Sequence, residues 1–200
     1  MPSSATSMNK REGDALRGPA ARSHLASRVD GRYKAAGPSR ILGIDPGTGI
    51  CGFGVIETTG RGINVRMLDC GVITTPHHTP LPERLLDIYN SLHEIIEVNQ
   101  PDCVSIEKLF FSKNITTGIS VAEARGVCIL VARQCNLPIF EYTPNEIKQT
   151  MTGYGGADKP QMQEMVRQHL KLAEVPKPDD AADALAAAIT HSLMLKTLNV

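Results

Sequence analysis

The chain contains no tryptophan and only 4% aromatic residues, and its hydrophobic residues never form a long uninterrupted run. No stretch approaches the ~18 to 20 consecutive apolar residues of a membrane span. The N-terminus also lacks the apolar core, roughly 7 to 15 residues long, of a secretory signal. We therefore expect neither a membrane-embedded nor an exported protein.

Cysteine pairs at metal-binding spacing are also absent. The five cysteines are an odd number, no two form a C-x-x-C motif, and most lie in apolar runs. They are Cys51, Cys70, Cys103, Cys128 and Cys135. This pattern predicts reduced core residues of a cytosolic protein and argues against a zinc site or a disulfide scaffold.

The net charge is zero, from 21 basic and 21 acidic residues, but the two signs are unevenly distributed. Residues 1–40 hold 8 Lys and Arg against 3 Asp and Glu, which leaves 13 bases and 18 acids for residues 41–200. A net acidic body argues against non-specific nucleic-acid binding over the whole surface, yet it is compatible with a local basic rim. Charge alone therefore does not identify the partner.

Residues 1–40 are rich in Ser, Ala, Arg and Gly and contain almost no large aliphatic residues. Because such a composition cannot bury enough surface to offset the entropy of ordering, we predict a disordered basic extension. Three interpretations stay open: an organelle transit peptide, a solvated tail able to touch DNA phosphates, or translated sequence upstream of a start at Met8. Residues 41–200 are expected to form one domain.

Apolar runs bounded by turn residues predict strands, and apolar residues three and four apart predict helices. The predicted strands lie at about 41–45, 51–57, 63–74, 103–107 and 137–142. Helices are predicted at about 85–100, 117–135 and 180–198. A further helix is predicted to begin at Asp158, where Asp158 and Gln161 have the D-x-x-Q spacing of a capping box. The first three strands form a meander, and the later alternation of strands and helices implies parallel pairing. The fold class is therefore α/β with a mixed sheet.

Four carboxylates stand where these predicted elements begin or end. Asp45 closes the first strand, Glu107 closes the fourth, and Asp180 and Asp183 lie three apart at the start of the last helix. Residues three apart share a helix face, and carboxylates at a sheet edge offer Mg²⁺ the hard oxygen ligands that it prefers. Two such ions can activate water and stabilise the leaving oxygen of a phosphodiester. Each position also has a structural interpretation, as a turn residue, strand end or helix cap, and spacing does not decide.

Four segments carry a more specific pattern: Ile41–Gly49 (ILGIDPGTG), Ser105–Phe110 (SIEKLF), Glu123–Val127 (EARGV) and Asp180–Ala186 (DAADALA). In order and approximate spacing, from about residue 40 to about 195, they resemble the bacterial RuvC family of crossover junction endonucleases. The resemblance implies an RNase H-like fold, a homodimer, and resolution of Holliday junctions by paired nicks during recombination and repair. It identifies the catalytic and metal-ligating residues as Asp45, Glu107, Asp180 and Asp183, with two Mg²⁺ ions per site and Mn²⁺ as a substitute.

The same resemblance assigns DNA contacts to Lys148, Lys159, Phe110, Lys113 and Asn114. A lysine beside carboxylates can neutralise a phosphate that the carboxylates would repel, and Phe110 matches an aromatic that stacks on an unpaired base. The alternatives are a solvated surface lysine at Lys159 and a core aromatic at Phe110. Four-way junction DNA and the branch-migration proteins RuvA and RuvB are the implied partners. The bacterial cytoplasm is the expected compartment, with organelle import as the alternative.

Two rival functions are disfavoured. An actin-like or sugar-kinase-like ATPase also opens with an Asp-x-Gly-Thr-Gly turn, but it needs two such domains, which residues 41–200 cannot hold. A catalytically silent junction-binding protein would be expected to lose carboxylates, and all four are present here. The histidines take no part in the expected site, and His93, His169 and His191 are predicted to lie on helix surfaces.

Overall fold

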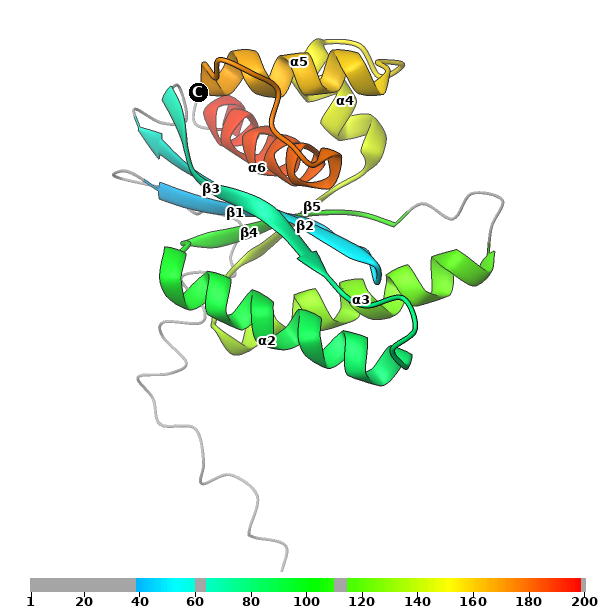
Figure 1. Cartoon of the computed structure of the whole chain (residues 1–200). Helices are drawn as coiled ribbons and strands as arrows, with labels where there is room; N and C mark the ends of the chain where they lie inside the picture. Colours follow the sequence, from blue (N-terminus) through cyan, green and yellow to red (C-terminus); the bar gives the residue numbers. More distant parts are fainter. Residues whose placement is uncertain (1–38, 60–63, 110–114, 199–200) are drawn as a thin grey trace, which may run out of the picture. The chain divides into compact units, whose positions relative to one another are not determined.

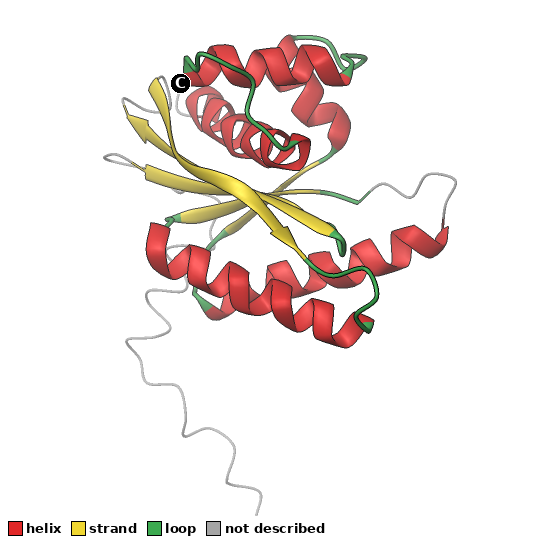
Figure 2. Cartoon of the chain, viewed as in Figure 1, coloured by secondary structure: helices red, strands yellow, loops and turns green. Residues whose placement is uncertain are grey.

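The computed structural model describes residues 39–59, 64–109 and 115–198, in which a five-stranded sheet lies between two layers of helices (Figure 1). The strands are β1 (Ser39–Asp45), β2 (Ile50–Thr59), β3 (Asn64–Thr74), β4 (Cys103–Glu107) and β5 (Ile139–Tyr142). The helices are α2 (Leu81–Asn99), α3 (Ile115–Gln134), α4 (Pro144–Thr152), α5 (Lys159–Leu170) and α6 (Asp179–Leu198). Figure 2 shows α2 and α3 on one face of the sheet and the other three helices on the opposite face.

The sheet has the order β3-β2-β1-β4-β5. Its first three strands pair antiparallel, whereas β4 pairs parallel with both β1 and β5. The predicted meander and the predicted mixed sheet are therefore confirmed. Because β1 and β4 are parallel neighbours, their last residues, Asp45 and Glu107, lie at the same edge of the sheet.

Side chains of β1 and β4 alternate between two hydrophobic clusters, one on each face of the sheet. The cluster that includes α2 and α3 contains Leu42, Ile44, Val104 and Ile106. The cluster that includes α4, α5 and α6 contains Ile41 and Cys103. Counting in twos from Ile41 and Cys103 places the side chains of Asp45 and Glu107 on the α6 face. The strand period thus selects the face on which the two carboxylates emerge.

Helix α6 packs closely on the sheet because both surfaces carry small residues. A Cβ atom at Gly43 would overlap the backbone carbonyl of Ala184, and one at Gly52 would overlap the backbone carbonyl of Asp180. The Ser105 hydroxyl donates a hydrogen bond of 2.7 Å to the Ala187 carbonyl. These contacts fix the height and the register of α6 over β1, β2 and β4.

Helix α4 was not predicted, although its sequence carries a helix-start pattern. The Thr143 hydroxyl accepts from the Glu146 backbone N–H, and the Glu146 carboxylate accepts from the Thr143 N–H. Pro144 occupies the first helical position, where its missing N–H is not needed. The helix is only nine residues long, so its apolar period is too short to stand out. The predicted capping box of α5, from Asp158 to Gln161, is confirmed.

The prediction that His191 lies on a helix surface is wrong. Its side chain is 2% exposed, its Nδ1 lies 2.7 Å from the Tyr142 hydroxyl, and its ring stacks on Phe140 at 3.9 Å between centroids. Helix α6 is enclosed by the sheet on one side and by α4 and α5 on the other, so this stretch of it has no solvent face. Burial lowers the pKa of His191 to about 4.

The five cysteines are all free, and Cys51, Cys103 and Cys128 are buried as predicted. Cys70 and Cys135 are only partly buried. Among the described residues, no helix combines the length and the apolar character that crossing a membrane requires.

We predict that Gly43→Ala lowers Tm by several degrees, because its new methyl group meets backbone atoms of α6, which cannot rotate away. Overpacking typically costs about 1–3 kcal/mol, and each kcal/mol shifts Tm by about 2–4 °C in a chain of this size. The matched control is Gly126→Ala on α3, where an added Cβ meets nothing within 4 Å. Thermal unfolding followed by circular dichroism measures both variants. Equal Tm values for the two would contradict the packing described here.

Candidate active site

The four predicted carboxylates converge at one edge of the sheet. Asp45 and Glu107 end the parallel strands β1 and β4, while Asp180 and Asp183 lie in the first two turns of α6, which crosses above them. Asp45 experiences electrostatic repulsion from all three of the others. The structure therefore brings together residues that are 138 positions apart in the sequence, from Asp45 to Asp183.

Burial and repulsion between like charges raise the pKa values of Asp45, Glu107 and Asp183. The pKa of Asp45 rises from its ordinary value of 3.8 to about 7, through burial first and then repulsion from Asp183, Glu107 and Asp180. Burial, followed by repulsion from Asp183, also raises the pKa of Glu107. Burial is the largest cause of the raised pKa of Asp183 as well, and Lys159 opposes it. Such a cluster favours a bound cation or proton.

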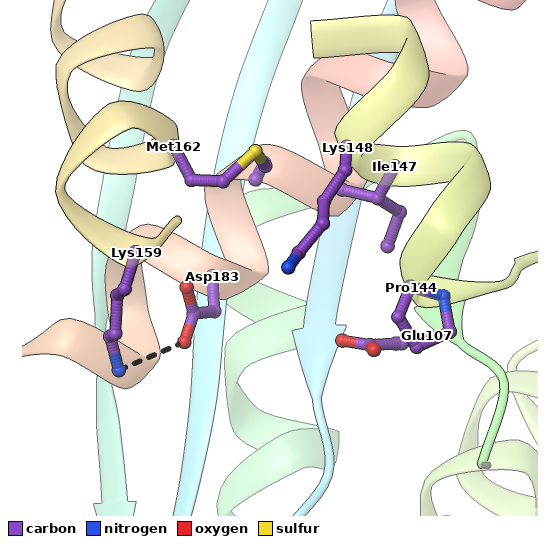
Figure 3. Close-up of a pocket in the computed structure, with 8 residues that line it drawn as sticks. Glu107, Pro144, Ile147, Lys148, Lys159, Met162 and Asp183 are labelled. Atoms are coloured by element: carbon purple, nitrogen blue, oxygen red, sulfur yellow. Dashed lines mark ion pairs between the residues drawn. The ribbon is translucent and has the colours of Figure 1, made fainter. Parts of the chain in front are cut away.

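A pocket of about 220 Å³ opens beside this cluster (Figure 3). Glu107, Lys148, Lys159 and Asp183 supply its polar lining, and its apolar wall consists of Pro144, Ile147, Met162 and Ala186. In Figure 3 the Lys148 side chain extends from α4 toward the space between Asp183 and Glu107. The positive charge of Lys148 opposes part of the rise in the pKa of Glu107. The pocket thus combines carboxylates with ammonium groups, the two charges needed to bind a cation and a phosphate.

Lys159, the first residue of α5, reaches back to α6. Its Nζ lies 3.4 Å from Oδ2 of Asp183 and 3.2 Å from Oδ2 of Asp179. Burial lowers the pKa of Lys159, but Asp183 and Asp179 outweigh that effect and raise it. Lys159 is half exposed, so it is neither a buried ion-pair partner nor a freely solvated lysine.

Three of the residues assigned to DNA contact, Phe110, Lys113 and Asn114, lie outside the described residues. Asp179, which is not among the predicted site residues, is paired with Lys159 in the structure. No sequence pattern distinguishes it, because its partner belongs to another helix.

The turn that follows Asp45 is held from the α2 side of the sheet. The Thr75 hydroxyl donates to the Thr48 carbonyl, and the Thr75 N–H donates to the Gly49 carbonyl at 3.0 Å. Arg84 of α2 donates from Nε to the Thr75 hydroxyl at 2.8 Å. This chain of hydrogen bonds fixes the backbone next to Asp45, and no motif in the sequence indicates it.

The donor set suits Mg²⁺ in kind, since carboxylate oxygens are its preferred protein ligands. It also suits a divalent cation electrostatically, because a positive charge would offset the repulsion that raises the pKa values of Asp45, Glu107 and Asp183. Within residues 39–59, 64–109 and 115–198, however, no three His, Cys, Asp and Glu side chains already form a compact ligand group. The carboxylates thus lie near one another at the site without forming a compact group of three.

Comparisons with known proteins agree on one family. The sequence profile described as "Crossover junction endodeoxyribonuclease RuvC" matches residues 41–191. The RuvC of Chloroflexus aggregans is 55% identical over 159 residues, which make up 80% of this chain and 96% of the relative. That of Desulfitobacterium hafniense is 54% identical over 159 residues, with coverage of 80% and 95%.

Solved structures give the same result for the fold. Thermus thermophilus RuvC in complex with a Holliday junction substrate superposes with a TM-score of 0.75 at 33% identity, covering 80% of this chain and 96% of that one. The yeast mitochondrial Holliday junction resolvase Ydc2 superposes with a TM-score of 0.60 at 15% identity, covering 87% of each chain. The predicted RNase H-like α/β fold is therefore confirmed.

We predict that Asp45→Asn raises Tm of the metal-free protein, and that it does so by more at pH 8 than at pH 5. Since the pKa of Asp45 is about 7 when folded and near 3.8 when unfolded, the folded chain binds more protons between these values. Its stability consequently falls as pH rises from about 4 to about 7. An uncharged side chain avoids that loss. We expect a gain of roughly 1–2 kcal/mol, or several degrees, at about 2–4 °C per kcal/mol.

The measurement is thermal unfolding in chelator at both pH values, with Asp87→Asn, an exposed site on α2, as the control. A gain of equal size at pH 5 and pH 8 would show that ionisation of Asp45 is not the cause.

Proposed function

The chain belongs to the RuvC family of crossover junction endodeoxyribonucleases, and from this premise we propose that it resolves Holliday junctions by Mg²⁺-dependent hydrolysis of DNA phosphodiesters. The observation that carries the proposal is the convergence of Asp45, Glu107, Asp180 and Asp183 at one edge of the sheet. The biological setting that follows is homologous recombination and DNA repair.

In this proposal the four carboxylates are the catalytic residues and hold two Mg²⁺ ions, for which Mn²⁺ can substitute. When bound, the ions supply Lewis-acid activation of the phosphodiester and of water. Asp45 and Glu107 are carried at the ends of paired strands, whereas Asp180 and Asp183 are placed by the seating of α6 on Gly52 and its neighbours. Ligands held on a strand edge and on a helix keep their relative positions better than ligands on loops.

Lys148 and Lys159 are proposed to contact the DNA backbone. Both line the pocket beside Glu107 and Asp183, where their charge offsets the repulsion between carboxylates and phosphate. Lys159 is held at the rim by Asp179 and Asp183, and phosphate would compete with them for the ammonium group. The assignments of Phe110, Lys113 and Asn114 to DNA contact remain part of the proposal.

A four-way junction has two strands to be cut, so we propose a homodimer whose two-fold axis presents two sites to the opposed strands. Each cut would leave a 5′-phosphate and a 3′-hydroxyl, which a ligase can rejoin. RuvA and RuvB are the proposed protein partners. Bacterial relatives at 54–55% identity favour the bacterial cytoplasm over the organelle-import alternative.

We predict that the purified protein nicks a labelled four-way junction symmetrically in Mg²⁺ and leaves a linear duplex of the same sequence intact. Chelator and the Asp45→Asn variant should each abolish cutting, because both remove metal binding at the site. Denaturing electrophoresis of each labelled strand gives the positions of the nicks. Tight junction binding without cutting would indicate a junction-binding protein, and equal cutting of the duplex would contradict structure selectivity.

We also predict that Lys148→Gln lowers the rate of junction cleavage at least 10-fold and weakens junction binding in chelator. Loss of one phosphate contact reduces the slope of log affinity against log salt concentration by about 0.9. The control is Lys171→Gln, which changes an exposed lysine at the opposite end of α5 from Lys159. Fluorescence anisotropy over a salt series measures the slopes. An unchanged slope for Lys148→Gln would remove Lys148 from the DNA contacts.

A further inference from the structure

One guanidinium group joins the end of β4 to its neighbouring strand. Arg125 lies on α3, and its Nε donates a hydrogen bond of 3.1 Å to the backbone carbonyl of Glu107. Its terminal nitrogen Nη2 pairs with the carboxylate of Glu141 on β5. Glu141 is the strand partner of Ile106, the residue just before Glu107. Arg125 therefore holds two adjacent strands together at the edge where the carboxylates emerge.

This contact lies where the sheet ladder gives the least support to Glu107. On the β1 side, the pairing of β4 ends at Ile106, opposite Ile44, so Glu107 is paired only with Tyr142 of β5. A strand end supported on one side rotates more easily about its backbone dihedrals than a residue inside the ladder. A hydrogen bond to the Glu107 carbonyl restricts that rotation.

The hydrogen bond acts on the backbone from the face opposite the pocket. Arg125 reaches Glu107 from α3, whereas the Glu107 side chain lines the pocket beside α4, α5 and α6. Fixing the carbonyl on one face therefore fixes the direction of the side chain on the other. Arginine suits this task, because its rigid planar group presents two donors at a set angle and the single ammonium of lysine does not.

The position of Arg125 beside Glu107 explains its presence better than its contribution to the stability of the fold does. The Arg125 side chain is 17% exposed, but that of Glu141 is 41% exposed, and pairs this open to solvent contribute no more than about 1 kcal/mol. Arg133 provides a comparison within the same helix, since its guanidinium donates to the Leu137 carbonyl at 3.3 Å in the turn before β5. Both arginines cap a backbone carbonyl, but only Arg125 does so at a carboxylate of the candidate site.

We propose that Arg125 is a positioning residue that orients the Glu107 carboxylate toward Mg²⁺ by hydrogen bonding to the Glu107 carbonyl while anchored on Glu141. This inference deepens the proposed function and rests on it. Substitution of a residue that hydrogen-bonds to a metal-ligating residue typically lowers metal affinity or activity by about 10- to 100-fold.

The test compares Arg125→Ala and Arg125→Lys with Arg133→Ala, which removes an equivalent arginine–carbonyl bond away from the site. Three quantities are measured for each: the rise in Tm caused by Mg²⁺ without DNA, junction affinity in chelator, and the single-turnover cleavage rate over a range of Mg²⁺ concentrations. A variant that binds Mg²⁺ less tightly gains less Tm at a given concentration, and that readout does not depend on cleavage.

For Arg125→Ala we expect cleavage to slow about 10- to 100-fold, with a smaller Mg²⁺-induced rise in Tm and junction affinity within about 3-fold of wild type. Arg125→Lys should recover little, and Arg133→Ala should cleave within about 2-fold of wild type even if its Tm falls. Glu141→Gln, which keeps Arg125 but removes its anchor, should show a smaller loss of the same kind. If Arg125→Ala fails to fold, Arg125→Lys and Glu141→Gln carry the test.

The inference is overturned if Arg125→Ala cleaves and responds to Mg²⁺ as Arg133→Ala does, or if junction binding falls in step with cleavage. In the second case Arg125 would contact DNA directly. Failure of the proposed function is distinguishable, because the wild-type protein would then not cut the junction at all. The Mg²⁺-induced change in Tm still compares the variants in that event.

Discussion

The close packing of α6 against the glycines of β1 and β2 determines most of the site. Gly43 and Gly52 have no side chain, and the backbone of α6 occupies the space that a side chain would fill. The helix backbone therefore packs directly against the backbone of the sheet. Asp180 and Asp183 therefore lie over the ends of β1 and β4. With larger residues in the sheet, α6 would stand farther away and its carboxylates would lie farther from Asp45.

Gathering carboxylates in this way opposes folding. Burial and repulsion raise the pKa of Asp45 to about 7, so in its ionised form this residue destabilises the native state. The hydrophobic clusters on the two faces of the sheet provide the stabilisation that makes such a site tolerable. Lys148 and Lys159 offset part of the negative charge on Glu107 and Asp183. Concentrated like charge of this kind is typical of sites that bind metal ions, where function is retained at some loss of stability.

The two helical layers have different roles around the site. Helices α4, α5 and α6 contribute all the side chains that line the pocket except that of Glu107, which belongs to β4. Helices α2 and α3 lie on the opposite face, yet Arg125 reaches from α3 to the Glu107 carbonyl at the end of β4. Arg84 reaches from α2 to the Thr75 hydroxyl, which holds the turn after β1. In each case an arginine acts on a strand end that carries a carboxylate, directly at Glu107 and through Thr75 near Asp45. The layer remote from the pocket thus supports the geometry of the layer that forms it.

Much of this architecture was determined by local pattern. The period of two in β1 and β4, together with the turn after β1, places Asp45 and Glu107, because strand alternation and turn formation depend on neighbouring residues. The prediction missed α4, whose nine residues are too few to show a clear period. It also placed His191 at a surface, because a helical pattern does not show that α6 is enclosed on both sides.

Only the tertiary structure decided the contacts between residues far apart in the chain. The pairing of Lys159 with Asp179, the burial of His191 and the bond from Arg125 to Glu107 each join different elements. Such contacts depend on the packing distance and register of whole helices on the sheet, which the small residues of both surfaces set together. The sequence by itself therefore determined which carboxylates the chain carries and at which element ends they stand. Three-dimensional packing decided that they meet, and which lysines and arginines surround them.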